Sequence, residues 1–186
     1  MFHYLPKKTT FLPYSISNWD DIVEVKRSKR KKIKIVHSPT SRDFKGSKYI
    51  LDALNILQDK YAHVEVSIIE NLPHTQALEL YKESDLVIDQ VLIGWYGAFG
   101  VEVMKMGKPL AVYIREDDLK FIPLDMAQDL METVINITPF NIVEKLSLYI
   151  ENENLLEDKA KAGLEYSNKW HNPMYVAGIV QSVYES

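Results

Sequence analysis

Two cations, Arg42 and Lys45, lie three residues apart in the segment Ser38 to Gly46, just ahead of a predicted helix. In that position both side chains can converge on one anion, and the helix N-terminus adds its partial positive charge. A diphosphate suits such a group, because two cations can neutralise its charge as it leaves. The alternative is a solvated loop with two surface cations. Without other evidence, the two cations alone favour that simpler interpretation.

A second segment with chemical potential runs from Gly94 to Glu102, where glycines recur at every third position. Such glycines let the backbone approach a ligand closely. The pattern matches neither G-x-G-x-x-G nor the P-loop, so it predicts neither dinucleotide nor triphosphate binding of those types. We expect Glu102 near the first turn of the next helix, where it could accept hydrogen bonds from two ribose hydroxyls. Its alternative is a helix-capping acid without a ligand.

Aromatic side chains follow the first of these glycines. Trp95 and Tyr96 are candidate platforms for a ligand. Packing against a neighbouring domain explains both residues equally well, so the sequence leaves these alternatives open.

Several other reaction classes lack the residues they need. The chain has no cysteine, which excludes disulfides, thiolate metal sites and a cysteine nucleophile, and which suits a reducing cytosol. Its five histidines show no ligand spacing such as H-E-x-x-H, so we expect no metal and no cofactor. The sequence contains no G-x-S-x-G elbow, and Ser-His-Asp hydrolysis therefore has no support.

The hydrophobic pattern predicts the elements that position these residues. Five short apolar segments are predicted strands: Ile33–His37, Val64–Ile69, Leu86–Ile88, Leu110–Ile114 and Thr133–Ile137. Helices are predicted from Tyr49 to Leu57, from Pro73 past Tyr81, up to Lys105, from Pro139 to about Glu151, from Leu155 to Trp170 and from Pro173 to Tyr184, with a loop and one helix between Arg115 and Leu130. This alternation predicts an α/β, doubly wound fold with a mostly parallel Rossmann-like sheet and C-terminal helices.

In an open α/β sheet, ligands bind outside the carboxyl ends of the strands. That rule selects three loops, Ser38–Gly46, Asn71–His74 and Gln90–Gly97. We therefore expect the candidate residues on these loops to face one site, with Asn71 as the candidate from the second loop.

The length of 186 residues fits one domain of ordinary size. We expect an irregular lead-in over residues 1–32 and the α/β domain over residues 33–186. No apolar run approaches the roughly 20 residues that span a bilayer. The first 17 residues do not form a secretory signal either, so we expect a cytoplasmic protein.

A basic cluster precedes the first strand, with seven cations within nine positions on a chain of net charge −4. Its members are Lys26, Arg27, Lys29, Arg30, Lys31, Lys32 and Lys34. The simpler interpretation is a solvated loop. The alternative is a patch for anionic lipid head groups, which would make the protein peripheral to the inner face of a membrane. We do not expect nucleic acid as a partner, because the cluster has no interleaved aromatic residues and the chain is acidic overall.

Read in order, the loops resemble a known family. The segments His37-Ser-Pro-Thr…Lys45-Gly46, Asn71-Leu-Pro-His74…Tyr81, Asp85 with Asp89-Gln90, and Gly94-Trp-Tyr-Gly97…Glu102-Val-Met-Lys-Met-Gly107-Lys-Pro109 carry the likeness. Together they resemble the C-terminal, donor-binding domain of retaining GT-B glycosyltransferases, the glycosyl transferases group 1 or family 4 enzymes. The likeness covers residues 33 to 184.

The resemblance implies a role for each candidate residue. Arg42 and Lys45 would grip the donor diphosphate, and Glu102 would hold the ribose. The backbone around Tyr96 and Gly97 would face the phosphates or the donor sugar. The family's E-x7-E motif departs here, because its first glutamate is replaced by Gly94. The contact to the sugar hydroxyls is therefore unassigned.

The resemblance also implies a reaction and its participants. A nucleotide-diphosphate sugar would be the donor, and its sugar would pass to an acceptor with retention, without a metal, by electrostatic stabilisation and positioning. Such enzymes bind the acceptor on a separate N-terminal domain, and two typical domains need roughly twice this length. We therefore expect an acceptor-binding domain or subunit as a partner. A non-catalytic nucleotide-sugar-binding module and an α/β interaction domain without a ligand are the alternatives.

Overall fold

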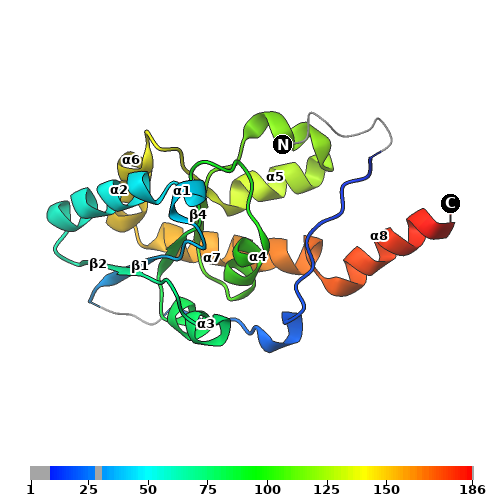
Figure 1. The fold of residues 1–186 in the computed structure, drawn as a ribbon, viewed down its shortest axis with the longest axis horizontal. Helices are drawn as coiled ribbons and strands as arrows, with labels where there is room; N and C mark the ends of the chain where they lie inside the picture. The colour runs from blue at the N-terminus through cyan, green and yellow to red at the C-terminus, as the bar shows by residue number, and fades with distance from the viewer. Residues whose placement is uncertain (1–8, 28–30, 186) are drawn as a thin grey trace.

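A computed structural model describes residues 9–27 and 31–185 of the chain, and its centre is one parallel β-sheet. The strands are β1 Ile33–His37, β2 Val64–Ile68, β3 Leu86–Ile88, β4 Leu110–Val112 and β5 Ile135–Asn136. They lie in the order β2-β1-β3-β4-β5. Helices alternate with the strands along the chain (Figure 1), which confirms the predicted α/β, Rossmann-like fold.

The helices of the described residues are α1 Arg42–Lys45, α2 Ser47–Lys60, α3 His74–Lys82, α4 Ala98–Lys105, α5 Leu124–Thr133, α6 Ile142–Glu151, α7 Asn154–Trp170 and α8 Pro173–Glu185. Two 3-10 turns, η2 Trp19–Asp21 and η3 Glu116–Phe121, complete the set. None of these helices is long and apolar enough to cross a membrane.

Each face of the sheet carries its own hydrophobic cluster, because successive strand residues point to opposite faces. Val36, Val87 and Val112 face a cluster that includes Met104 of α4 and Tyr166 of α7. On the other face Ile35, Ile88 and Ala111 meet Leu54 of α2 and Leu146 of α6. Burial on both faces explains why the central strands β3 and β4 are apolar throughout.

Two local predictions differ from the structure. The segment after β1 holds the short helix α1, which ends at Gly46 in a left-handed conformation (φ 71°) with its N–H bonded to the carbonyls of Arg42 and Asp43. Pro139 does not begin α6. The first helical carbonyl belongs to Asn141, which accepts from Lys145 N–H at 2.9 Å, and the Asn141 side chain accepts from Thr138 N–H at 2.7 Å. The Asn141 side chain therefore orders the turn before α6, and it makes no capping hydrogen bond to the helix itself.

The segment before β1 packs onto the domain over its described residues. It runs past α4 toward α3 (Figure 1) and buries Ile16, Trp19 and Ile22 in the cluster on that face. Val25 N–H donates to the carbonyl of Met106 at 2.9 Å. The irregular backbone expected over residues 1–32 therefore contributes side chains to the core.

A substitution at Gly46 would test how tightly the loop after β1 is packed. A Cβ at this position would lie 2.6 Å from Val91 Cγ2 and 2.9 Å from Leu92 Cγ, in a backbone conformation that side chains rarely adopt. We expect Gly46→Ala to lower the free energy of unfolding by about 1–3 kcal/mol, measured by urea denaturation. Gly178→Ala in α8 is the matched control, because its Cβ would meet nothing within 4 Å. Equal stability of the two variants would contradict this packing.

Candidate functional site

The order of the strands reverses between β1 and β3. From β1 the chain forms β2 on one side, then crosses to β3 on the other side of β1. In sheets of this kind the crevice at the carboxyl ends of the two central strands is the usual ligand site. The last residue of β1, His37, pairs in register with the last residue of β3, Ile88. The loops that follow these strands therefore begin side by side.

An ion pair between Lys45 and Asp89 lies at this crevice. Lys45 ends α1, in the loop after β1, and Asp89 directly follows β3. The carboxylate of Asp89 is buried, with a side-chain exposure of 1%, and its Oδ2 has no hydrogen-bond partner in the described structure. Burial raises the pKa of Asp89, and the charge of Lys45 opposes that rise. The ammonium also lies 5.6 Å from the ring centroid of Phe99.

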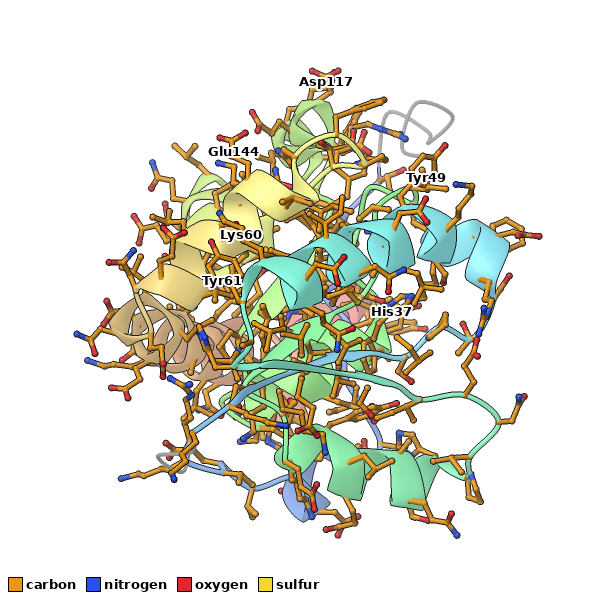
Figure 2. All side chains as sticks on the ribbon, turned by 90° about the vertical axis from the view of Figure 1, so that its left-hand side faces the viewer. His37, Tyr49, Lys60, Tyr61, Asp117 and Glu144 are labelled. Atoms are coloured by element: carbon orange, nitrogen blue, oxygen red, sulfur yellow. The ribbon has the colours of Figure 1, made fainter. Side chains whose placement is uncertain are left out.

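His37 makes a second bridge between the same strands. The ring lies below α2 (Figure 2), and its Nδ1 is 2.9 Å from the carbonyl of Ile88 while its Nε2 is 2.8 Å from Ser47 Oγ. These partners suit a neutral ring that donates from Nδ1 and accepts at Nε2. Burial lowers the pKa of His37 to about 4, and the nearby charge of Lys45 acts in the same direction.

Arg42, at the start of α1, is paired differently from Lys45. Its Nε and Nη2 donate to the two carboxylate oxygens of Glu70 at 2.8 and 2.5 Å. This exposed contact lowers the pKa of Glu70. Arg42 also lines a cavity of about 440 Å³ together with Gly46 and Leu92. Both predicted cations thus stand in the loop after β1, and each faces a carboxylate.

Glu102 is the fifth residue of α4, which begins at Ala98, so it lies directly after the first turn, close to the expected position. The helix N-terminus stabilises a carboxylate there less than one within the first turn. Instead Asn18 Nδ2 donates to Oε1 at 3.0 Å, and His74 Nε2 lies 3.1 Å from Oε2. The lead-in segment and the start of α3 therefore both hold the side chain of Glu102.

Tyr96 points into the protein core. Its hydroxyl lies 2.7 Å from the hydroxyl of Tyr166 and 3.0 Å from His171 Nε2. Burial raises the pKa of Tyr96 and of Tyr166. His171 Nδ1 in turn bonds the carbonyl of Tyr14 at 2.7 Å. The Tyr96 side chain therefore packs within the domain, and contact of its loop backbone with a ligand stays a prediction.

The three glycines of this loop serve different purposes. A Cβ at Gly97, the N-cap of α4, would meet nothing within 4 Å, so a ligand can approach its backbone. A Cβ at Gly100 would lie 2.9 Å from Tyr96 Cβ and 3.1 Å from Leu110 Cδ2, so this glycine lets α4 pack on β4. The space beside Gly94 is occupied by the side chain of Arg115. Of these three glycines, only Gly97 therefore has the open space that close approach of a ligand requires.

Asn71 is exposed and adopts a left-handed conformation (φ 56°) after β2. Within the described residues, no side-chain hydrogen bond or ion pair joins the predicted site residues to one another. Their roles stay predictions. Sequence reasoning gave no role to Asp89, His74 or Asn18; an acid directly after an apolar strand was a usable signal for Asp89, but nothing marked Asn18.

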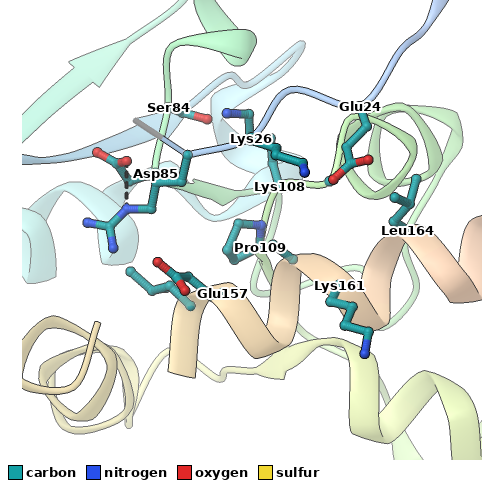
Figure 3. A pocket seen from close by; sticks show the side chains of 13 residues that line it. Glu24, Lys26, Ser84, Asp85, Lys108, Pro109, Glu157, Lys161 and Leu164 are labelled. Atoms are coloured by element: carbon teal, nitrogen blue, oxygen red, sulfur yellow. Dashed lines mark hydrogen bonds and ion pairs between the residues drawn. The ribbon is translucent and has the colours of Figure 1, made fainter. Parts of the chain in front are cut away.

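Another cavity, of about 370 Å³, opens at the amino ends of β3 and β4 (Figure 3). Its lining includes Lys26, Arg27, Asp85, Lys108 and Pro109. Arg27 donates to Asp85 at 2.8 Å and to Glu153 at 2.6 Å. This cavity lies at the edge of the sheet opposite to the crevice.

Other cations of the basic cluster also have acidic neighbours on the domain. Lys32 lies 3.6 Å from Glu65, and Lys34 lies 2.9 Å from Glu83. Lys29 and Arg30 lie outside the described residues.

In the described part of the chain, no group of three or more His, Asp or Glu side chains is arranged to hold a metal ion.

Comparison with solved structures shows which known proteins share this fold. No family model matches the sequence, and no curated protein does. Among solved structures, the C-terminal domain of a glycosyl transferase group 1 family protein, LpcC from Francisella tularensis, matches over 84% of this chain and 94% of that domain, at 17% identity and a TM-score of 0.54. The chain has the fold of a GT-B half-domain.

Two longer proteins contain the same GT-B half-domain fold. Sucrose-phosphate synthase from Thermosynechococcus elongatus matches over 92% of this chain at 12% identity and a TM-score of 0.59. Anabaena HepE, solved in complex with UDP and glucose, matches over 84% at 14% identity and a TM-score of 0.60. In each case this chain spans 49% of the longer protein.

The two buried histidines predict how stability depends on pH. Burial lowers the pKa of His37 and of His171 from 6.5 to about 4. Between these values the unfolded chain binds protons that the folded chain does not, so stability falls as the pH falls. We expect each histidine to contribute about 2 kcal/mol of that loss between pH 7 and 5, measured by urea denaturation. His171→Asn should reduce the slope, whereas His63→Asn, at a histidine that is not buried, should not. Equal slopes in both variants would contradict a buried neutral His171.

Proposed function

We propose that this chain binds a nucleotide-diphosphate sugar at the crevice between β1 and β3 and serves as the donor-binding half of a glycosyltransferase. The observation that carries the proposal is the position of Lys45 at the point where the strand order reverses in a GT-B half-domain fold. The presence of UDP in the HepE structure supports a nucleoside diphosphate as the ligand class.

Lys45 would supply fixed positive charge to the diphosphate. A cation held in place beforehand stabilises developing negative charge without reorganising at the moment of reaction. Asp89 holds the ammonium at the crevice, and the low exposure of both groups strengthens the interaction of Lys45 with a bound anion. Arg42, at the other end of α1, would add a second cation if the diphosphate takes the place of Glu70.

Glu102 would accept hydrogen bonds from the ribose hydroxyls. A carboxylate has about four lone-pair sites, so the contacts from Asn18 and His74 leave acceptor capacity for a ligand. These two contacts fix the orientation of the carboxylate. The open space at Gly97 would admit a phosphate or the sugar to the start of α4.

The reaction we propose is transfer of the sugar to an acceptor with retention, in polysaccharide biosynthesis, with no metal or cofactor. The acceptor would bind on a partner domain or subunit. The second candidate is a non-catalytic nucleotide-sugar-binding module, which the glycine at position 94 favours because no acidic side chain is available there to contact the sugar. Turnover of donor by the chain, alone or with its partner domain, would exclude that module.

Calorimetric titration with UDP, GDP and ADP tests the site. We expect Lys45→Ala to weaken diphosphate binding by tenfold or more while leaving the nucleoside largely unaffected, because a charge-assisted hydrogen bond contributes about 1.5–3 kcal/mol. Glu102→Gln should weaken both nucleoside and diphosphate. Lys48→Ala, which removes a highly exposed cation from the neighbouring turn of α2, is the control and should change neither.

Lys45→Ala leaves the buried carboxylate of Asp89 unpaired, which destabilises proteins strongly. The double variant Lys45→Ala/Asp89→Asn removes both charges and keeps the binding test interpretable. Absence of binding heat from folded wild-type protein with all three nucleotides would overturn the proposed function.

A further inference from the structure

Arg115 occupies the space next to Gly94. A Cβ at Gly94 would lie 3.2 Å from Arg115 Cβ and 3.5 Å from its Cζ and Nε. The backbone of Gly94 is left-handed (φ 85°), and its carbonyl accepts from Arg115 N–H at 2.9 Å. A side chain at position 94 would therefore be strained by the left-handed backbone and would crowd the arginine. The glycine and the arginine form one structural unit.

This unit belongs to the same edge of the sheet as the crevice. Arg115 follows the carboxyl end of β4, and β4 lies beside β3, which lies beside β1. The distance from β1 to β4 is two strand spacings, roughly 10 Å. Gln90 joins the loops after β3 and β4, because its amide donates to Tyr113 O at 2.8 Å and accepts from Ile93 N–H at 2.7 Å. A ligand with its diphosphate at Lys45 can therefore extend along this edge toward Arg115.

The guanidinium of Arg115 differs from the cations of the first loop in its pairing. Lys45 and Arg42 each make hydrogen bonds to a carboxylate. Arg115 forms an ion pair with the buried carboxylate of Asp118, in which Nη1 lies 3.6 Å from Oδ2, beyond hydrogen-bond distance, and 35% of the arginine side chain is exposed. A guanidinium only donates hydrogen bonds, and its planar fork matches a carboxylate with two parallel bonds.

We propose that Arg115 determines the specificity of the donor site by binding the carboxylate of a uronic-acid sugar. This inference rests on the proposed function and names the class of its substrate. A neutral hexose presents only a hydroxyl at the corresponding carbon, which forms a weaker hydrogen bond with the guanidinium. Gly94 makes the selection possible, because its missing side chain leaves room for the arginine.

Matched donor pairs test the inference by calorimetry. UDP-glucose and UDP-glucuronic acid differ only in a hydroxymethyl or carboxylate group at C6, as do GDP-mannose and GDP-mannuronic acid. For the nucleoside diphosphate that the chain binds, we expect the wild type to bind the uronic-acid donor at least tenfold more tightly. Arg115→Gln should abolish that ratio and leave the affinity for the nucleoside diphosphate within twofold. Arg115→Lys should keep part of the ratio.

Lys120→Gln is the matched control, since it removes the same charge from an exposed position in η3, the 3-10 helix that follows Arg115. It should leave the ratio unchanged. Equal affinity for both donors of a pair, with nucleoside diphosphate binding intact, overturns the role of Arg115 and leaves the proposed function standing. A ratio that persists in Arg115→Gln has the same consequence. No binding of any nucleoside diphosphate overturns both proposals.

Discussion

An ion pair between the half-buried ammonium of Lys45 and the buried carboxylate of Asp89 joins the first loop of this chain to the end of β3. Burial costs Asp89 its hydration, and the attraction of Lys45 offsets that cost, so removing Lys45 leaves an unpaired buried carboxylate. The left-handed Gly46, directly after Lys45, ends α1 and precedes α2, and it packs closely on Val91 and Leu92. The geometry of the crevice depends on this contact.

The described part of the lead-in segment contacts residues of the candidate site. Asn18 reaches the carboxylate of Glu102, and Tyr14 supplies the carbonyl that orients His171 under Tyr96. These contacts span 84 and 157 positions in the sequence. The hydrogen bonds around Tyr96 therefore hold the loop after β3 on the side that faces the core. Asn18, which precedes the first strand, holds α4 on its outer side.

The fold and the chemistry of this protein rest on different observations. Identities of 12–17% accompany the match to GT-B half-domains, because burial on both faces constrains the sheet more than the loops. Function belongs to the residues grafted onto such a fold. In this chain Gly94, in the loop after β3, lies next to Arg115, in the loop after β4.

Periodicity and turn residues determined the α/β class, all five strands and the loops at their carboxyl ends, because these depend on local hydrophobic pattern. The sequence also identified Lys45 as a candidate residue, because it is a cation just ahead of a predicted helix. The partners of that cation and of Glu102 were not, because Asp89, Asn18 and His74 approach through the strand order and through packing of distant segments. The start of α6 at Ile142 likewise required the backbone. Residue types thus specified which chemistry is available, and tertiary structure decided which groups meet, since contacts between remote segments leave no local pattern.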